Sequence, residues 1–190
     1  NLDFNAVNAA LVAKQIDATW APHRVLALRD RGIVRIVTSS NELDGAGSLQ
    51  GALIGAQAFL AQYPNAAKRV VKRVVEASHW LSQEENRAAQ IELVAAQSSY
   101  PIASVAEALR DADLNFHYSP LLDTYFLSNF QRNIELAKKF GLIRRTFELE
   151  PWIDRRFLDA AIEELGYRDV WKPHDSFVGK TVATTLTQSP

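Results

Sequence analysis

The hydrophobic pattern changes partway along the chain, and this change limits the possible folds more than any other feature. Before residue 40, short strand and helix signals alternate. Residues 16–20 alternate large and small side chains, and residues 33–37 are mostly β-branched, so both predict strands. Pro22 and Gly32 mark the two ends of a helix between them. A strand, a helix and a second strand at this spacing predict a parallel α/β layer.

After residue 55 the pattern is almost entirely that of amphipathic helices. A further strand is expected at 49–54, weakened by Gly51. Asn65 is predicted to cap a Val-rich helix. Since a sheet usually has about four to six strands, we expect the missing strands upstream of residue 1. The predicted helices are 6–14, 57–62, 65–81, 84–97, 101–110, 121–140 and 151–165.

The charge and the reactive side chains exclude several classes of function. Lys and Arg number 21 against 22 Asp and Glu, and a net charge of −1 gives no field to hold nucleic acid or an anionic membrane. The absence of Cys excludes disulfides, thiolate zinc ligands and a thiol nucleophile from these 190 residues. The four His form no metal-binding motif, so we expect neither a metal nor a cofactor. No apolar run reaches the roughly 18 residues that a membrane span needs.

One basic cluster lies on the predicted Val-rich helix. Nucleic-acid binding would need interleaved aromatic residues and a basic domain, and neither is present. We therefore interpret the cluster as a solvated face, with contact to a membrane-embedded partner as the alternative. Its members are Lys68, Arg69, Lys72 and Arg73.

Four short motifs occur in a fixed order along residues 3–166. They are Gln-Ile-Asp-Ala (15–18) after an Ala-rich helix, Trp-Ala-Pro (20–22) followed by Gly-Ile-Val-Arg-Ile-Val (32–37), Phe-Leu-Ala-Gln-Tyr-Pro-Asn (59–65), and Leu-Ala-Lys-Lys-Phe-Gly-Leu-Ile (136–143) with Trp-Ile-Asp (152–154). In this order the motifs resemble the solute-binding proteins of ABC importers for nitrate, taurine and aliphatic sulfonates. Relatives that act in thiamine-pyrimidine uptake and synthesis share the same pattern.

The resemblance implies the C-terminal part of a two-lobed, type II periplasmic-binding-protein-like fold of α/β class, rich in helix. Residues 1–45 would end the second lobe, residues 46–180 would return to the mainly helical first lobe, and residues 181–190 would form a flexible tail. The missing N-terminal half, or another copy of the chain, would complete the fold. The resemblance also implies a periplasmic or extracellular location, with the protein associated with the membrane through the ABC permease subunits.

The candidate ligand-binding residues lie where a predicted strand gives way to a helix. In open parallel α/β layers, ligands bind beyond the carboxyl ends of the strands. A helix start also offers free N–H groups to an anion. Trp20 would then wall the apolar part of a ligand, Pro22 would open the helix, and His23 would donate a hydrogen bond. The alternative is that Trp20 packs in the core and His23 is solvated.

The turn-rich segment 39–48 is the predicted crossover between the lobes. Small residues absorb backbone rotation easily, so Gly47 and Gly51 are candidate hinge residues. Ser48 and Gln50 lie between them and are candidate ligand contacts. The alternative is an ordinary surface loop.

These observations predict a transport protein that closes two lobes on a small anion or an organosulfonate-like ligand. No Ser–His–Asp arrangement has local sequence support and no Gly-rich phosphate loop is present, so we predict no catalytic residues and no enzyme. Two alternatives remain. One is an enzyme on the same fold, desulfinase-like or pyrimidine-synthase-like. The other is a helical interaction domain, which predicts that residues 1–40 pack as helices without pairing of 16–20 with 33–37.

Overall fold

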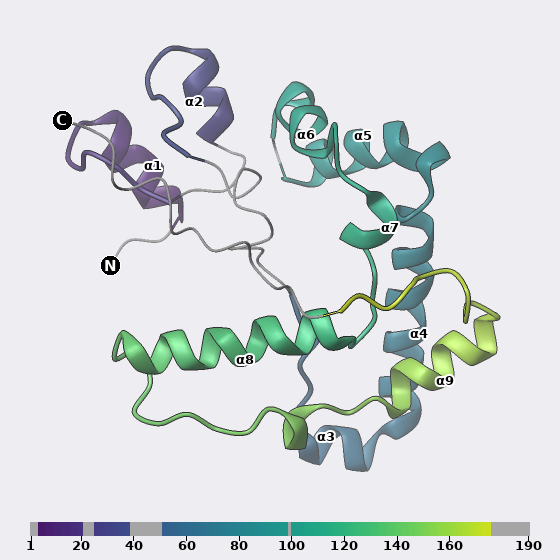
Figure 1. The fold of residues 1–190 in the computed structure, drawn as a ribbon. Coiled ribbons are helices and arrows are strands. Elements are labelled where there is room, and N and C mark those ends of the chain that lie inside the picture. Colours follow the sequence, from purple (N-terminus) through teal and green to yellow (C-terminus); the bar gives the residue numbers. More distant parts are fainter. Residues whose placement is uncertain (1–3, 21–24, 39–50, 99, 176–190) are drawn as a thin grey trace. The chain divides into compact units, whose positions relative to one another are not determined.

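The computed structural model describes residues 4–20, 25–38, 51–98 and 100–175 (Figure 1). Within these ranges the regular structure is helical, and no residue forms a β-strand. The chain divides into two compact units. Unit 1 comprises residues 1–39 and 84–113, and unit 2 comprises residues 40–83 and 114–190.

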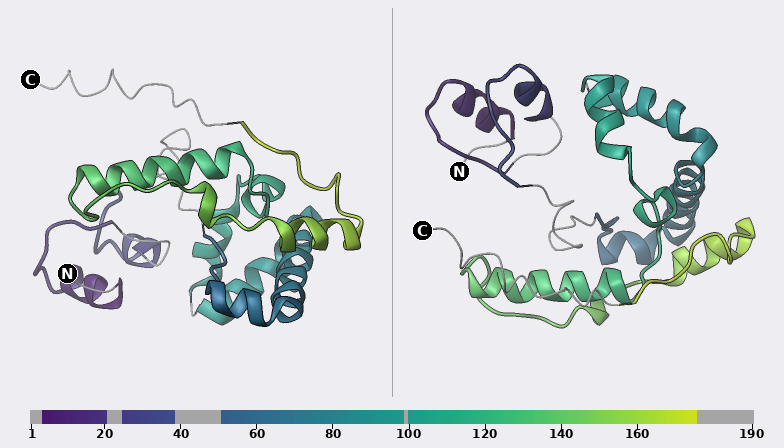
Figure 2. Two further views of the ribbon diagram at one scale, coloured as in Figure 1. Left: turned by 90° about the horizontal axis from the view of Figure 1, so that it is seen from below. Right: turned by 45° about the horizontal axis from the view of Figure 1, so that its top comes forward.

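Unit 1 contains a helical hairpin and two short helices that precede it in the chain. The short helices are α1 (Phe4–Val12) and α2 (Leu26–Asp30). The hairpin consists of η3 (Glu84–Asn86), α5 (Arg87–Ser98) and α6 (Ile102–Leu109), and its two long helices pack together (Figure 2). Its core is formed by Ala95, Val105 and Leu109, with Ile91 and Val94 packed against them.

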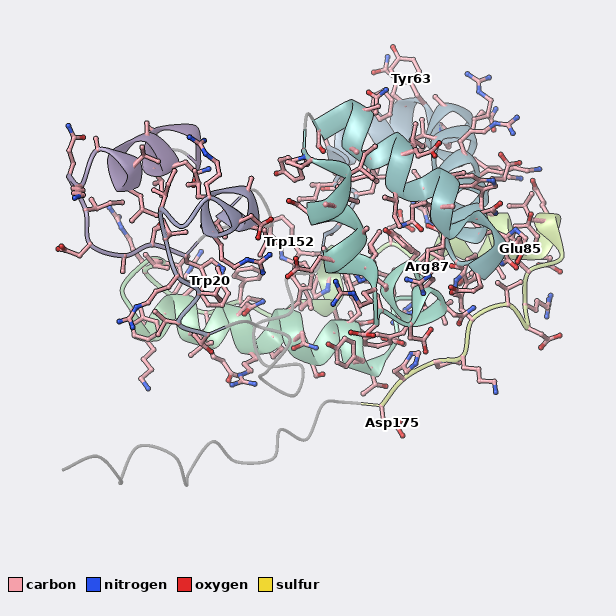
Figure 3. The ribbon with its side chains drawn as sticks, turned by 90° about the horizontal axis from the view of Figure 1, so that it is seen from above. Trp20, Tyr63, Glu85, Arg87, Trp152 and Asp175 are labelled. Carbon is pink, nitrogen blue, oxygen red and sulfur yellow. The ribbon has the colours of Figure 1, made fainter. Side chains whose placement is uncertain are left out.

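A single arginine closes this hairpin. Arg87 lies at the start of α5 (Figure 3). It donates hydrogen bonds to the carbonyl oxygens of Leu109 and, at 2.9 Å, Ala112. These carbonyls lie at and just beyond the end of α6, where a helix leaves acceptors without internal partners. Arg87 also pairs with Glu84, its Nη2 atom 2.8 Å from Oε2. The arginine therefore caps one helix from the first turn of the other.

Unit 2 is organised around the packing of α4 (Pro64–Leu81) against α9 (Arg156–Leu165). Its buried core consists of Val75, Leu158, Ala161 and Trp171. The indole Nε1 of Trp171 donates to Ser82 Oγ over 2.9 Å, so the buried polar atom of the tryptophan is satisfied. The other elements of unit 2 are α3 (Gln57–Gln62), α7 (Leu114–His117), α8 (Thr124–Lys139) and η4 (Glu150–Trp152).

Local sequence signals explain most helix ends. Helix α4 has Pro64 at its first position, where the missing N–H costs nothing. The prediction that Asn65 caps this helix is wrong, because the N-cap residue is Tyr63 and no side chain caps it. Helix α8 is capped by Asp123, whose Oδ1 accepts from the Phe126 N–H at 2.9 Å. Gly166 follows α9 with φ of 70°, in the left-handed region that ends many helices.

The strand predictions are wrong for the described residues. Residues 16–20, 33–37 and 51–54 are irregular, and 16–20 do not pair with 33–37. A helix satisfies its N–H and C=O groups internally, whereas a strand needs a neighbouring strand. None of the described segments supplies that neighbour. Helix-rich architecture is confirmed, and the sheet of the predicted α/β class is not present among the described residues.

The predicted helices agree with the structure more closely. The range 57–62 is matched by α3, and the expected helix at 6–14 corresponds to α1. The predicted lobe boundaries near residues 45 and 180 lie outside the described residues. Across the described helices, none combines the length and apolar character needed to cross a bilayer.

Candidate functional site

Trp20 is the one predicted ligand-binding residue that the structure describes. It lies on the segment between α1 and α2 in unit 1 (Figure 3). Its residue surface is 61% exposed. Its carbonyl oxygen accepts a hydrogen bond from Thr19 Oγ1 at 3.3 Å. The alternative that Trp20 packs in the core is therefore wrong. An exposed indole offers a flat apolar face together with an N–H donor.

The other predicted site residues are described only in part. Gly51 belongs to unit 2, is exposed, and has no neighbouring atom within 4 Å of the position that a Cβ would take. A larger side chain would meet no obstacle there, so no close approach of the backbone accounts for this glycine. Of the predicted site residues, the structure therefore describes Trp20 in unit 1 and Gly51 in unit 2. The residues outside the described ranges are Pro22, His23, Gly47, Ser48 and Gln50.

A bidentate ion pair joins two distant segments of unit 1. Arg29 on α2 places Nη1 2.5 Å from Oε1 and Nη2 2.7 Å from Oε2 of Glu107 on α6. The same Nη2 lies 2.6 Å from Asp30 Oδ1. The side chains of Arg29 and Glu107 are 32% and 33% exposed. Two planar groups meeting fork to fork form the strongest geometry of such a pair.

The protonation equilibria of both partners reflect this contact. Hydrogen bonding to Glu107, and then to Asp30, raises the pKa of the Arg29 guanidinium above its ordinary value. The hydrogen bond from Arg29 lowers the pKa of the Glu107 carboxyl. Two carboxylates thus engage the guanidinium, which makes Arg29 a poor receptor for a free anion.

The basic cluster on α4 is also largely matched by carboxylates. Lys68 and Lys72 both contact Glu164 on α9, with Lys72 Nζ 3.3 Å from Oε2. Arg73 Nη1 lies 2.5 Å from Glu76 Oε2. The hydrogen bond from Lys68, and then that from Lys72, lowers the pKa of the Glu164 carboxyl. Lys68, Lys72 and Glu164 therefore form an ion-paired seam between α4 and α9, whereas Arg73, whose side chain is 77% exposed, pairs within α4 and lies on the predicted solvated face.

Unit 2 also has an open depression of about 290 Å³ beside α8. Two of its lining residues, Glu148 and Glu150, are carboxylates, which would repel an anionic ligand. Within the described parts of the chain, no three His, Cys, Asp or Glu side chains are placed to hold a metal ion. The depression is lined by Leu127, Ser128, Gln131, Glu148, Leu149 and Glu150.

Three long-range polar contacts were not predicted from the sequence. Arg29 and Glu107 are 78 residues apart, and Trp171 and Ser82 are 89 apart. Arg87 reaches carbonyls that are 22 and 25 residues away. No local pattern of residues signals any of these pairs, because each depends on how separate helices pack.

Comparison with known proteins adds two findings. Residues 3–95 match the model of the NMT1-like family. The fold is similar to that of SsuA from Methylobacillus flagellatus KT, a structure described as the periplasmic sulfonate-binding protein of a sulfonate ABC transporter. The TM-score is 0.71 at 20% identity, over 94% of this chain and 54% of the other.

The extent of these matches limits what they show. No curated protein matches the chain. The chain spans about half the length of the SsuA structure, and at this level of identity the similarity concerns the fold. The segment that matches the family model includes Trp20 and three of the four sequence motifs. The match over residues 3–95 and the similarity of fold together confirm, for part of the chain, the resemblance to nitrate-, taurine- and sulfonate-binding proteins.

Proposed function

We propose that the chain is part of the solute-binding component of an ABC importer and binds a small anion or an organosulfonate-like ligand between two lobes. The observation that carries this proposal is the combination of the family match over residues 3–95 with the fold of a periplasmic sulfonate-binding protein. A periplasmic location and docking on permease subunits are parts of the same proposal. We propose no chemical step on the ligand.

The described charges favour a particular mode of anion recognition. Arg29, Lys68 and Lys72 are each engaged by carboxylates in the structure. We propose that neutral donors recognise the anion, since backbone N–H groups at a helix start and polar side chains hold anions without an added charge. Pro22, His23, Ser48 and Gln50 remain the proposed positions around the ligand. Gly47 and Gly51 remain the proposed hinge.

Trp20 would contact the organic part of the ligand. Its exposed indole offers an apolar surface to an alkyl or aryl group, while the anionic group binds the donors nearby. Binding would shift the population from an open to a closed form by its differential affinity for the two. This division of roles predicts that removal of the indole weakens organosulfonates more than nitrate.

A thermal-shift panel tests the proposal. The panel contains nitrate, bicarbonate, taurine, alkylsulfonates, arylsulfonates and a pyrimidine. A ligand present at about 100 times its Kd stabilises the folded state by about 2.7 kcal/mol, which is visible as a raised Tm. We expect a shift with one class of anion, reduced in Trp20→Ala.

Trp152→Ala is the matched control, because Trp152 is 75% exposed and lies in unit 2. It should keep the full ligand-induced shift of the unsubstituted chain. Absence of a shift with every compound would contradict the proposal. An equal loss of the shift in both variants would contradict the role of Trp20.

One observation favours a second candidate, a helical interaction domain. The described residues between 4 and 38 form two helices and no paired strands. This candidate predicts that no compound of the panel raises the Tm. The similarity of fold to a binding protein over 94% of the chain places it second.

A further inference from the structure

The end of α8 and the segment that follows it combine basic and apolar side chains on the surface of unit 2. We call residues 136–147 the α8 tip, and Figure 1 shows the chain turning back there toward η4. The tip contains four basic residues and no acidic one. It also exposes large apolar side chains. The basic residues are Lys138, Lys139, Arg144 and Arg145, and the exposed apolar residues are Leu136, Phe140, Leu142 and Phe147.

The backbone of the tip forms a defined turn at the end of α8. Gly141 has φ of 70°, and its N–H donates to the Lys138 carbonyl at 3.1 Å. The Leu142 N–H donates to the Ala137 carbonyl at 2.8 Å, which completes a Schellman motif. An apolar contact often accompanies this motif, yet the residue surface of Leu142 is 79% exposed. The turn therefore holds Leu142 at the surface without burying it.

The cations of the tip lack the carboxylate partners that the lysines of the α4–α9 seam have. Among the residues that the structure describes, Lys139, Arg144 and Arg145 form no ion pair. Lys138 Nζ donates to the Arg144 carbonyl at 2.7 Å, which leaves the lysine charge without a counter-charge. Lys139 Nζ lies 6.0 Å from the centre of the Phe140 ring, so a cation and an exposed aromatic ring are adjacent.

The neighbouring carboxylates in the sequence lie outside the tip. Glu148 lines the depression beside α8 together with Gln131. Gln131 precedes Lys139 by eight residues, which is about 12 Å along a helix axis. Glu135 lies one turn before Lys139 on α8, and the two form no ion pair in the structure. The tip therefore presents positive charge and apolar surface together.

We propose that the α8 tip binds the surface of an anionic phospholipid membrane. Its cations bind lipid phosphates, while Phe140 and Leu142 enter the boundary between headgroups and acyl chains. A membrane interface offers anionic groups and apolar chains within roughly 10 Å of depth. Four cations alone would suit any acidic surface, and apolar side chains alone would suit any apolar one. The membrane interface is the partner that uses both.

The net charge of −1 is compatible with this contact. It removes attraction at long range, but basic residues attract anionic lipid within a Debye length, about 8 Å at physiological salt. The inference is also independent of the proposed ligand-binding function, because the tip belongs to unit 2 and the proposed ligand contact Trp20 belongs to unit 1. Failure of one proposal therefore leaves the other standing.

Co-sedimentation of the full chain with vesicles tests the proposal. One set of vesicles contains phosphatidylcholine alone, and the other contains equal parts of phosphatidylcholine and phosphatidylglycerol. We expect the chain to sediment with the anionic vesicles and to stay in solution with the neutral ones. High salt should release it, because salt screens the contact between the cations and the lipid phosphates.

Two variants separate the charges from the apolar contacts. The triple variant Lys139→Gln, Arg144→Gln and Arg145→Gln should weaken binding about a hundredfold, since each basic residue near the lipid surface contributes about fivefold. Phe140→Ser with Leu142→Ser should weaken binding by about tenfold or more, because it removes the apolar area that the interface buries. All five positions are exposed, so neither variant should lower the Tm of the free chain.

Matched substitutions elsewhere on the surface serve as controls. Arg31→Gln, Arg35→Gln and Arg69→Gln change the net charge by the same amount at exposed positions outside the tip. Val37→Ser with Ile54→Ser removes two apolar side chains that are also exposed. Both controls should bind anionic vesicles as the unsubstituted chain does. Equal losses of binding in the tip variants and their controls would overturn the proposal.

A fluorescent label tests whether the tip itself enters the interface. The chain has no Cys, so Thr146→Cys gives a single labelling site in the tip and Asp111→Cys gives one in unit 1. The emission of an environment-sensitive dye at 146, and not at 111, should shift to shorter wavelength on anionic vesicles. Absence of vesicle binding, or the same shift at both positions, would overturn the proposal. Dimerisation that depends on the tip, without vesicle binding, would instead assign this surface to a second copy of the chain.

Discussion

The helix pair α4–α9 of unit 2 and residues 4–38 of unit 1 differ in how they are stabilised. Between α4 and α9, Val75 is 1% exposed, Ala161 is fully buried and Trp171 is 3% exposed. Among the side chains described between residues 6 and 38, Ala10 is the buried one, while Trp20 and Val37 are 61% and 80% exposed. The helix pair buries its apolar side chains internally, whereas the described residues between 4 and 38 leave apolar side chains exposed.

This difference supports the proposed position of the ligand contact in the loosely packed region. A well-packed helix pair gives a rigid support, whereas segments with few buried contacts open at little cost. Binding residues are commonly carried by such segments and positioned by a rigid scaffold. The proposed ligand contact, Trp20, lies in the loosely packed region.

The largest expected effect is on the helix pair. Trp171→Ala removes the buried indole and its hydrogen bond to Ser82, and should lower the free energy of unfolding by about 3–5 kcal/mol. Chemical denaturation measures the loss. Trp152→Ala, which removes an exposed indole, should cost less than about 0.5 kcal/mol. Similar losses in the two variants would remove the distinction between packed and exposed regions.

A glycine substitution compares a fixed helix end with the proposed hinge. Gly166 has φ of 70° and nothing within 4 Å of its Cβ position, so Gly166→Ala should cost about 1 kcal/mol from backbone strain alone. Gly51→Ala has neither a positive φ nor a close neighbour and should leave stability within about 0.5 kcal/mol. Thermal melting of both variants shows which substitution lowers stability more. The prediction would be wrong if Gly51→Ala were the more destabilising of the two.

A smaller effect concerns the ion-paired seam of α4 and α9. Lys68 and Lys72 lower the pKa of the folded Glu164 carboxyl, so the pair stabilises the protein above the unfolded pKa of about 4.3. That stabilisation is lost as the pH falls through the lower, folded pKa. The Tm measured between pH 7 and pH 3 should therefore fall at the acid end.

The variant Glu164→Gln should show a shallower fall in Tm over the same pH range. The remaining dependence of Tm on pH would come from Glu107, Glu84 and Asp154. Arginine partners lower the pKa values of these carboxyls too. Glu135→Gln on the exposed side of α8 is the control. Identical pH profiles for Glu164→Gln and the unsubstituted chain would show that the seam contributes nothing to acid sensitivity.

The smallest effect on stability is expected in the loosely packed region. Val37→Thr preserves the β-branched shape at a position that is 80% exposed, so the free energy of unfolding should change by less than about 0.5 kcal/mol. Equilibrium denaturation checks this expectation. A loss above about 1 kcal/mol would mean that Val37 is buried in solution.

The helical half of the fold was predictable because its signals are local. Pro64 at the start of α4 and Gly166 after α9 mark helix ends within a single turn of chain. The strand-like segment 33–37 was misread because a β-branched run reports a preference, whereas pairing depends on a partner distant in sequence. The exposed residues Ile33, Ile36 and Val37 show that preference without the partner.

The candidate site was predictable to a lesser extent. Trp20 was chosen because a large aromatic residue stood at an expected strand-to-helix junction. That strand is absent from the structure, and the exposed indole leaves the ligand contact a prediction. The contact of Arg29 with Glu107 had no such signal, since both are common surface residues 78 positions apart. Long-range pairs of this kind depend on tertiary packing, which no local spacing encodes.

The central claim is that a rigid helix pair supports a region that responds to a ligand. Amide hydrogen exchange, measured with and without each compound of the panel, tests this claim most directly. Amides of α4 and α9 should exchange slowly in both conditions. Amides of Thr19 and Trp20 and of residues 34–38 should exchange quickly alone and slow markedly with one class of anion, because binding orders the segment. Unchanged exchange in these residues with every compound, or slow exchange without any, would contradict the account.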